Sequence, residues 1–385
     1  MKKLNVLDLF AGCGGLSKGF EKAGFNILAA NEIWHPAAET HRMNHPNTFM
    51  VEGDITNQKI KQMLIKICKD KVDVIIGGPP CQAYSVAGRR DPTDPRGKLF
   101  EDYVDIVKSL KPSFFVMENV KGILSMMHDR EDLADDKINK VQEMREQVDE
   151  ISSILKHNKL NENEVKFYKE RLLHLKKDIK QYQEKVTDMI AKRFKRIGYD
   201  MGFQVLNAAD YGVPQKRERV IFIGTNTKKK ITFPTPTHSM NPQIKLDGKK
   251  LDKWNTVAKA IGDLENKEED TKLHHILPSH SVEFLKKIQN TPIGKSVFRN
   301  YTDAFYRCNP NEPSRTVKEN HNGVFLHYSK DRVMTPRELA RLQDFDDDFI
   351  FFGGKSSVLV QIGNAVPVGL AKAIASHVKG LINIK

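Results

Sequence analysis

Short apolar runs of strand length alternate with helix-length segments in the first part of the chain, and this alternation limits the possible folds more than any other feature. The runs cover residues 3–10, 26–31, 71–76, 113–117 and, later, 220–224. Apolar residues stand at successive positions within them, as in strands that are buried on both faces. The pattern predicts an α/β fold with a doubly wound, Rossmann-like mixed sheet that helices cover on both sides.

Residues 129–196 interrupt this alternation with a segment that contains neither glycine nor proline. Apolar residues recur there at spacings of three and four over 138–155 and again over 165–189. Such a seam predicts two antiparallel helices packed as an inserted hairpin, and Asn161 with Glu164 can form a capping box at the second helix. An inert insertion and an arm for a partner, for DNA or for self-association all fit this pattern.

Residues 225–315 are rich in proline, lysine and polar residues, which is typical of a small separate lobe built from loops. After this lobe the sequence again shows patterns typical of helices. Thr335 followed by Pro336 predicts the start of a helix, because threonine caps well and proline suits the first turn. A final helix is expected over 368–381.

The charge balance favours a polyanionic partner, since the chain carries a net charge of +13 and phosphate contacts need a basic surface. The four cysteines are scattered without a C-x-x-C pair, so no metal site is expected and a reducing cytoplasm is the natural compartment. No apolar run of membrane-spanning length and no secretory signal is evident, so no membrane association is expected.

A glycine-rich turn follows the first strand in Asp8-Leu9-Phe10-Ala11-Gly12-Cys13-Gly14-Gly15-Leu16. Glycines there let the backbone approach a ligand closely. Glu32 stands at the end of the second strand, where a ribose diol would lie, and Asp54 follows later. These residues predict a nucleoside pocket along the strand ends. A dinucleotide site fits less well, because Ser17 stands near the expected third glycine.

Cys81 follows the third strand in a proline-led turn, Gly77-Gly78-Pro79-Pro80-Cys81-Gln82. A cysteine in a loop is more open to reaction than one in a core, and a thiolate can add to an electron-poor ring carbon such as carbon 6 of cytosine. Glu118 ends the next strand and in its protonated form could donate to cytosine N3. Arg217 and Arg219 alternate before the last strand and could hold the base carbonyl, a phosphate or the carboxylates.

Six motifs together resemble the DNA (cytosine-5)-methyltransferases, and they stand in that family's order. They are Phe10-Ala11-Gly12-Cys13-Gly14-Gly15, Pro79-Pro80-Cys81-Gln82, Glu118-Asn119-Val120, Gln215-x-Arg217-x-Arg219, Arg315-Thr316 and Gln361-Ile362-Gly363-Asn364-Ala365-Val366-Pro367. The resemblance covers nearly the whole chain except the hairpin and the variable lobe. It implies an S-adenosylmethionine-dependent methyltransferase fold that methylates carbon 5 of a cytosine flipped out of duplex DNA.

The resemblance also implies roles for single residues. Cys81 would be the nucleophile, Glu118 would engage N3 and the amino group, Arg217 would anchor the base and Arg219 would support it. Cofactor contacts are implied for a set that lines the strand ends: Phe10, Ala11, Gly12, Gly14, Gly15, Leu16, Glu32, Ile33, Asp54, Ile55, Pro79, Leu99, Asn364 and Val366. Within this set Ile33 is expected to pack on adenine, and Trp34 follows it directly.

DNA contacts are implied for the loop that follows the nucleophile and for the lobe. Candidates are Gln82, Ser85, Arg89 and Arg90 in the loop, and Arg299, Arg307 and Arg315 in or beside the lobe. On this basis residues 1–224 and 316–385 form the catalytic, cofactor-binding domain, 129–196 the hairpin, and 225–315 the target-recognition domain.

The implied setting is a bacterial, cytoplasmic, nucleoid-associated enzyme of a restriction–modification system. Its partner is double-stranded DNA, a cognate restriction endonuclease would act separately, and a monomer is expected unless the hairpin binds a partner. Two alternatives are a tRNA cytosine-5 methyltransferase and a non-catalytic DNA-binding scaffold that works through the hairpin. A variable lobe of roughly ninety residues favours DNA, because it is large enough to read a duplex groove.

Overall fold

The computed structural model describes residues 3–80, 95–242, 250–298, 304–319 and 325–383 of the chain. The chain forms two compact units. The first comprises Met1–Pro80, Lys98–Lys121 and Ile197–Lys385, and the second comprises Cys81–Gly97 and Gly122–Arg196.

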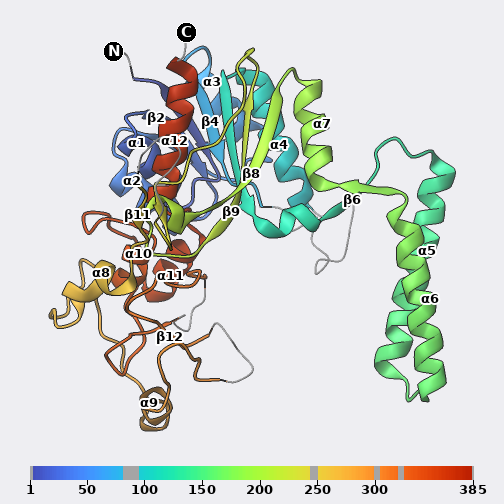
Figure 1. Cartoon of the computed structure of the whole chain (residues 1–385). Helices are drawn as coiled ribbons and strands as arrows, with labels where there is room; N and C mark the ends of the chain where they lie inside the picture. The colour runs from blue at the N-terminus through green and yellow to red at the C-terminus, as the bar shows by residue number, and fades with distance from the viewer. Residues whose placement is uncertain (1–2, 81–94, 243–249, 299–303, 320–324, 384–385) are drawn as a thin grey trace. The chain divides into compact units, whose positions relative to one another are not determined.

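A seven-stranded sheet forms the centre of the first unit and confirms the predicted α/β fold (Figure 1). Its order is β3 (Phe49–Glu52), β2 (Asn26–Glu32), β1 (Asn5–Leu9), β4 (Val74–Gly77), β5 (Phe114–Val120), β9 (Glu218–Thr225) and β8 (Asp200–Asn207). The strands from β3 to β5 run parallel, and β9 runs antiparallel to both of its neighbours. The carboxyl ends of the parallel strands therefore lie along the same end of the sheet, where ligands bind in such folds.

Two strands of this seven-stranded sheet were absent from the prediction, and both lie at its edges. β3 has only four residues and exposes Phe49, while β8 mixes polar with apolar residues and is largely accessible to solvent. Edge strands need not be apolar on both faces, so neither produces the continuous run on which the other strands were recognised.

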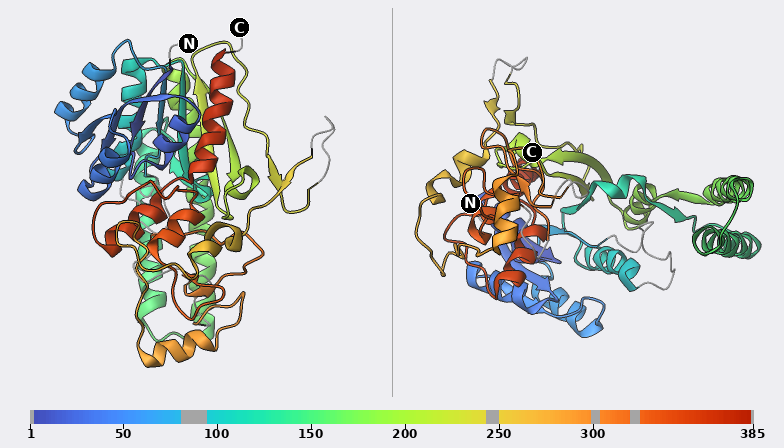
Figure 2. Two further views of the ribbon diagram at one scale, coloured as in Figure 1. Left: turned by 90° about the vertical axis from the view of Figure 1, so that its left-hand side faces the viewer. Right: turned by 90° about the horizontal axis from the view of Figure 1, so that it is seen from below.

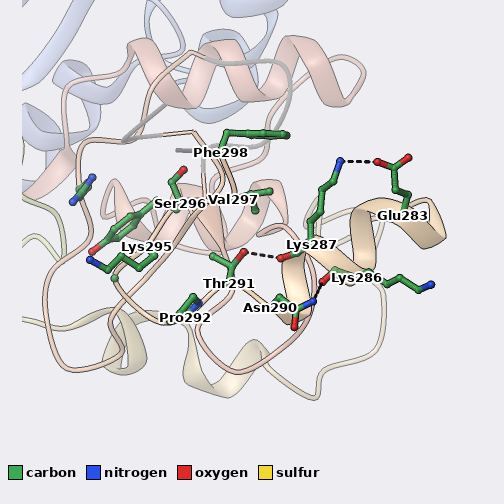
Figure 3. A pocket seen from close by; sticks show the side chains of 13 residues that line it. Glu283, Lys286, Lys287, Asn290, Thr291, Pro292, Lys295, Ser296, Val297 and Phe298 are labelled. Atoms are coloured by element: carbon green, nitrogen blue, oxygen red, sulfur yellow. Dashed lines mark hydrogen bonds and ion pairs between the residues drawn. The ribbon is translucent and has the colours of Figure 1, made fainter. Parts of the chain in front are cut away.

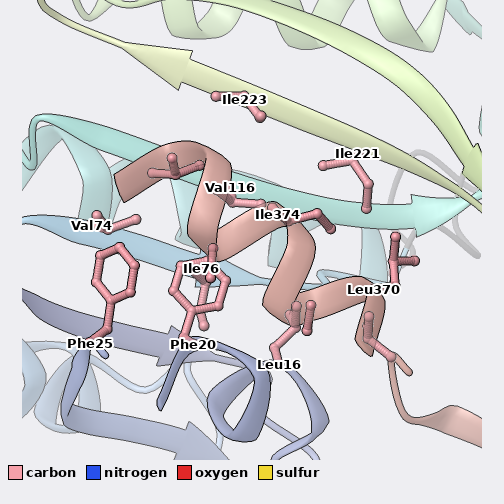
Figure 4. Close-up of a cluster of buried hydrophobic side chains, with 14 of the residues drawn as sticks. Leu16, Phe20, Phe25, Val74, Ile76, Val116, Ile221, Ile223, Leu370 and Ile374 are labelled. Atoms are coloured by element: carbon pink, nitrogen blue, oxygen red, sulfur yellow. The ribbon is translucent and has the colours of Figure 1, made fainter. Parts of the chain in front are cut away.

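Helices α1 (Gly15–Lys22), α2 (His35–Asn44), α3 (Gln58–Cys68), α4 (Pro95–Leu110) and α12 (Val368–Asn383) belong to the same fold. The last helix, α12, lies beside α1 although the two are far apart in sequence (Figures 1 and 2). Figure 4 shows Leu16 and Phe20 of α1 next to Leu370 and Ile374 of α12, close to the strand residue Ile76. The end of the chain therefore packs back against the first motif.

The close packing of α1 on α12 depends on Gly19. A Cβ atom at Gly19 would overlap Ala371 and would lie 2.6 Å from the backbone nitrogen of Lys372. We expect Gly19→Ala to lower the free energy of unfolding by about 1–3 kcal/mol, because an overpacked interface must shift.

Gly380 in α12 provides the matched control. Apart from Gly380 itself, its two neighbours and the surrounding backbone of α12, no atom of the described residues lies within 4 Å of the position that a Cβ at Gly380 would take. Gly380→Ala should therefore raise the free energy of unfolding by up to about 1 kcal/mol, since alanine is the better helix former. Urea denaturation of both variants measures the contrast, and equal effects would contradict it.

The C-terminal stretch Lys355–Asn383 is long and apolar enough by composition to cross a membrane, contrary to the sequence-based expectation. It consists of two helices, α11 (Lys355–Asn364) and α12, and 72% of its most apolar window is buried inside the protein. This burial accounts for its apolar character, as for any core helix.

The second unit contains the predicted antiparallel hairpin, formed by α5 (Asp135–His157) and α6 (Glu162–Lys180) (Figure 1). The Asn161–Glu164 capping box is present at α6. A small apolar seam joins the helices, built from Val141, Met144, Val148, Leu175, Ile179 and Tyr182.

The prediction that the second helix continues to Met189 is wrong. The helix ends at Lys180, and residues Gln183–Lys185 form strand β7, which pairs with β6 (Met127–Asp129). These ladder hydrogen bonds replace helical ones, and Val186 and Met189 belong to a separate helix, α7 (Val186–Arg196). The three-and-four spacing runs through both helices, so spacing alone did not mark the break.

The lobe predicted for 225–315 contains β10 (His238–Ser239), β11 (Asp252–Lys253), α8 (Val257–Ile261), α9 (Val282–Gln289) and β12 (Tyr306–Arg307). Its apolar core is shared with residues that follow it, including β13 (Phe325–Leu326) and α10 (Pro336–Leu342). The predicted start of α10 is confirmed, since Thr335 caps it and forms a capping box with Glu338.

Candidate active site

The glycine-rich turn after β1 takes a backbone conformation that constrains its residue types. Phe10 (φ 57°), Gly12 (φ 56°) and Gly14 (φ 99°) all have positive φ. Glycine adopts this conformation without penalty, whereas a phenylalanine there is strained. Such strain persists where the surrounding structure enforces it, often at a ligand site. The turn is held by hydrogen bonds from the Ala11 amide to the Asn31 carbonyl and from the Gly14 amide to the Ala11 carbonyl.

Glu32 links this turn to the end of β2. Its Oε2 accepts from the Gly12 amide at 2.8 Å, and its Oε1 accepts from the amides of Ile33 (3.0 Å) and Trp34 (2.8 Å). Burial raises the pKa of Glu32 above its usual value. A carboxylate offers about four acceptor positions, so one position remains for a ligand hydroxyl.

The cofactor contacts predicted from sequence fall into two groups by their exposure. Ile33 is 64% exposed, and Asp54 and Asn364 are exposed as well, so one apolar and two polar side chains are accessible to a ligand. This combination of side chains fits a nucleoside. The other predicted contacts are buried or half-buried: Ala11, Leu16, Ile55, Pro79, Leu99 and Val366. The Ile55 side chain is only 2% exposed, so a ligand could meet its backbone but not its side chain.

The two ends of the chain meet at this pocket. A Cβ atom at Gly15 would lie 2.5 Å from the carbonyl oxygen of Val366 and 3.3 Å from the Cβ of Ala365. Asn364 is the last residue of α11, directly before this contact. The motif around Asn364 therefore completes the pocket that the first motif begins.

A buried polar network lies beneath the turn, and no sequence motif indicates it. Ser17 donates from Oγ to Asp8 Oδ2 at 2.6 Å, and the His41 Nε2 lies 3.1 Å from the same Oγ. The ring of His45 lies 4.3 Å from that of His41, and a Cβ at Gly14 would lie 2.5 Å from His45 Nε2. The serine and the two histidines belong to separate parts of the sequence, so only the fold brings them together.

Asp8 is expected to make stability fall as pH rises. Burial raises the pKa of Asp8 to about 7, from an ordinary value of 3.8. Between these values the folded state keeps a proton that the unfolded state releases, so stability falls by ~1.4 kcal/mol per pH unit. Asp8→Asn should therefore gain stability relative to the unmodified protein as pH rises from about 4 to about 7, and no further above that. Urea denaturation from about pH 5 to about pH 8 measures this; a difference that does not change with pH would contradict it.

Glu118 and Arg219 form an ion pair at the end of β5. Strands β5 and β9 pair so that Val120 lies opposite Arg219, which puts Arg219 on the same face of the sheet as Glu118. Arg219 Nε lies 2.7 Å from Glu118 Oε1, and the side chains of Arg219 and Glu118 are 13% and 14% exposed, respectively. The pair is thus fixed in place while the carboxylate keeps access to a ligand.

The chain that leads to Cys81 passes directly against Glu118. A Cβ atom at Gly78 would lie 3.1 Å from Glu118 Oε2, and Asn119 donates from Nδ2 to the Pro79 carbonyl at 3.0 Å. The sequence places Asn119 in a motif but reveals no role for it. Cys81 itself lies outside the described residues, as do the predicted DNA contacts Gln82, Ser85, Arg89, Arg90 and Arg299.

The buried position of Arg217 does not fit its predicted role of anchoring the base. Arg217 is 3% exposed and donates from Nη1 to the Val317 carbonyl (2.7 Å) and from Nη2 to the Gly363 carbonyl (2.9 Å). Burial lowers its pKa to about 9, so it remains charged at neutral pH. Arg217 therefore ties the segments after the lobe to the catalytic fold, and Arg219 is the arginine beside Glu118. Alternation along the chain does not reveal which arginine faces the core.

The prediction that Arg307 contacts DNA is also wrong. Its guanidinium group is buried and donates to the carbonyls of Thr291, His327, Lys330 and Ile288, with Asp331 at 3.0 Å. These partners use all of its nitrogen atoms, so Arg307 holds loops of the lobe together.

Arg315 lies instead at an open pocket of the lobe. Its guanidinium carbon sits 3.9 Å from the centre of the Tyr306 ring, within the range of a cation–π contact. The pocket has a volume of about 910 Å³, and Lys286, Lys287 and Lys295 line it with Arg315 (Figure 3). Lys287 is paired with Glu283. This basic pocket can accept a phosphate or a base edge.

One group of side chains has the geometry of a cation site but is already neutralised. His35, Glu39 and Glu52 could hold a metal ion. Arg42 donates to both carboxylates, and His35 Nδ1 lies 2.9 Å from Glu52 Oε1. The guanidinium supplies the positive charge there, so the group is explained without a metal.

Comparison with known proteins identifies a family and a fold. The model of the family "C-5 cytosine-specific DNA methylase" matches residues 4–161 and 173–380. The type II methyltransferase M1.HphI of Haemophilus parahaemolyticus is 34% identical over 97% of this chain and 86% of its own length. The type II methyltransferase M.NgoPII of Neisseria gonorrhoeae is 33% identical over 98% of this chain and 95% of its own length.

Two solved structures share the fold. A prophage-encoded DNA modification methyltransferase from E. coli has a TM-score of 0.65 and 24% identity, covering 99% of this chain and 100% of that one. A Spodoptera frugiperda DNMT2 variant has a TM-score of 0.59 and 17% identity, with the same coverage. In both cases the similarity is in the arrangement of helices and strands.

Proposed function

Since the chain belongs to the C-5 cytosine-specific DNA methylases, we propose that it methylates a cytosine in a short duplex sequence through a covalent intermediate on Cys81. The broader assignment is established: the chain is a DNA cytosine-5-methyltransferase of the kind found in type II restriction–modification systems. Our proposal extends this assignment to the covalent step and to the residues of this chain that perform it.

S-adenosylmethionine would supply a methyl group that is already activated on a sulfonium. The exposed Ile33 side chain would pack on the adenine, and Asp54 would accept from its amino group. Glu32 would use its remaining acceptor position for the ribose. The turn from Phe10 to Gly15, closed by Asn364, would hold the methionine end. These contacts orient the methyl group towards the ends of β4 and β5.

The target cytosine must leave the base stack, because carbons 5 and 6 are not accessible inside the duplex. Cys81 Sγ then forms a bond to carbon 6, and Glu118 donates a proton to N3, which makes carbon 5 nucleophilic. Carbon 5 takes the methyl group as the bond between that methyl group and the sulfonium would break, leaving a neutral thioether. A base removes the proton from carbon 5, the bond between carbon 6 and sulfur breaks, and Cys81 leaves as a thiolate. N3 then returns its proton to Glu118.

The observation that carries this proposal is the Glu118–Arg219 pair against Gly78, three residues before Cys81. Arg219 fixes the carboxyl group, and Asn119 fixes the backbone that leads to the nucleophile. A carboxyl group and a thiol are thereby expected at the ends of adjacent parallel strands, which is the arrangement that addition to carbon 6 with protonation of N3 requires.

Recognition of the DNA sequence would fall to the lobe at 225–315, with Arg315 and the lysines of the basic pocket as candidate contacts. The biological role we propose is protection of a host sequence against a separate restriction endonuclease. The names of the relatives support that role.

A methyl-transfer assay tests the substrate directly. The protein is incubated with S-adenosylmethionine labelled in its methyl group and with either unmethylated bacterial DNA or bulk tRNA, and the product is digested to nucleosides. We expect label in 5-methyl-deoxycytidine from duplex DNA only. Label in 5-methylcytidine from tRNA alone would replace the DNA substrate with RNA, and label in neither would contradict the proposal.

A further inference from the structure

A row of lysines runs along one side of α6 in the hairpin. Lys166, Lys169, Lys176 and Lys180 are spaced by three, seven and four residues, and all are exposed. Leu173, 69% exposed, stands in the middle of the row. The row extends over roughly fourteen residues, which is about 21 Å of helix. Within the part of the chain that the structure describes, no acidic side chain pairs with these four lysines.

The lysines lie beside the seam between α5 and α6 rather than in it. The seam residues of α6 include Leu175 and Ile179. Successive residues of an α-helix are rotated by about 100° around its axis. On this basis the centre of the lysine row lies about 95° around the axis of α6 from the centre of the seam. These side chains are therefore not needed for the packing of the hairpin, and they form a separate surface along its length.

The opposite face of the hairpin is acidic. Glu143, Glu146 and Glu150 are exposed on α5. They lie about 145° around the helix axis from the seam, in the direction opposite to that of the lysine row on α6. In an antiparallel pair, opposite senses of rotation lead to opposite faces (Figure 1). The lysine face also has Lys156, and its acidic residues, Asp149 and Glu162, are fewer than its lysines. The hairpin thus has one basic and one acidic face.

This division of charge favours DNA over a second copy of the chain as the occupant of the basic face. A symmetric dimer would bring identical faces together and oppose like charges, while basic-to-acidic contact between copies leads to an open chain of molecules. A row of about 21 Å matches about six base pairs of duplex at about 3.4 Å each. The acidic face would point away from the phosphates.

We propose that the lysine row of α6, Lys166, Lys169, Lys176 and Lys180, binds the phosphate backbone of duplex DNA without regard to sequence. This inference rests on the assignment of DNA as substrate and adds a second contact surface outside the lobe and the catalytic pocket. Contacts to phosphates position a duplex but carry no sequence information. The surface would raise the affinity of the enzyme for long DNA and would leave the methyl-transfer step unchanged.

The test is a quadruple variant of the intact protein, K166Q/K169Q/K176Q/K180Q. Glutamine keeps a similar helix propensity, and circular dichroism confirms that the hairpin is retained. Binding of a fluorescent duplex of random sequence, about 40 base pairs long, is measured by anisotropy at several KCl concentrations. Each lost phosphate contact lowers the salt slope by ~0.9, so a decrease of about 3 to 4 is expected, with at least ~10-fold weaker binding at low salt.

A matched control changes the same net charge elsewhere. Lys59, Lys66, Lys69 and Lys71 are exposed on and after α3, and K59Q/K66Q/K69Q/K71Q should alter the slope by less than one. Equal slopes for the two variants, or an unchanged slope in the α6 variant, would overturn the proposal. Loss of a dimer in the α6 variant at unchanged DNA affinity, measured by analytical ultracentrifugation, would assign the row to self-association instead.

Failure of this inference is distinguishable from failure of the proposed function. Methyl transfer to bacterial DNA at saturating DNA concentration should be equal in the α6 variant and the unmodified protein. Normal transfer with an unchanged salt slope contradicts only the lysine row, whereas absent transfer in both proteins contradicts only the proposed chemistry.

Discussion

Glu118→Gln is expected to lower the single-turnover rate of methyl transfer by about 10²- to 10⁴-fold, the usual range for removal of a general acid. Glutamine has nearly the same shape but cannot release a proton to N3. It also cannot keep the charge that attracts Arg219, whose Nε lies 2.7 Å from Glu118 Oε1. Binding of S-adenosylmethionine should change little, because the cofactor contacts come from other strand ends.

The measurement compares single-turnover rates and cofactor affinity for Glu118→Gln and a control, Glu218→Gln. Glu218 is exposed and pairs with Lys121 on the surface, so its loss should change the rate by less than about twofold. A loss below about tenfold in Glu118→Gln, or an equal loss in the control, would remove Glu118 from the chemical step.

Arg217→Met is expected mainly to lower stability, whereas Arg219→Met is expected mainly to slow methyl transfer. Arg217→Met should lower the free energy of unfolding by about 2–5 kcal/mol, because the carbonyls of Val317 and Gly363 lose their buried donors. Arg219→Met should cost less, about 1–3 kcal/mol of stability, because one mostly buried ion pair is lost. It should nevertheless slow methyl transfer by about 10²-fold, because the Glu118 carboxyl group would lose its fixed orientation.

Urea denaturation and single-turnover kinetics on both variants separate these outcomes. Arg217→Lys is a useful companion, since it keeps the charge but cannot reach both carbonyls with a planar group. A stable, inactive Arg217→Met variant would support a base-anchoring role for Arg217 and would contradict its assignment as a residue that stabilises the fold.

The sheet and its main strands could be predicted from the sequence because those strands are buried on both faces and appear as apolar runs. The strand-end location of Glu32 and Glu118 could be predicted because residues at the carboxyl ends of parallel strands lie along the same end of the sheet. The strand that precedes Asp54, β3, was not predicted. The capping box at Asn161 and the helix start at Thr335 could also be predicted, because their residues are neighbours in sequence.

The remaining features depend on contacts between distant segments. Arg307 and Arg217 were assigned to DNA and to the base, yet both donate to buried carbonyls. Which face of a loop becomes buried depends on what packs on it, and the spacing of residues in the sequence does not reveal this. The Asp8–Ser17–His41 network joins β1, α1 and α2, so no single motif contains it.

Covalent trapping on DNA tests the role of Cys81 most directly. The protein is incubated with S-adenosylmethionine and a mixed pool of duplexes that contain 5-fluorocytosine, and denaturation-resistant complexes are measured by mass. Fluorine at carbon 5 cannot leave as a proton, so the bond between Cys81 and carbon 6 should persist after methyl transfer. We predict a stable adduct that disappears in Cys81→Ser; an adduct that survives this change, or none with active protein, would contradict the covalent mechanism.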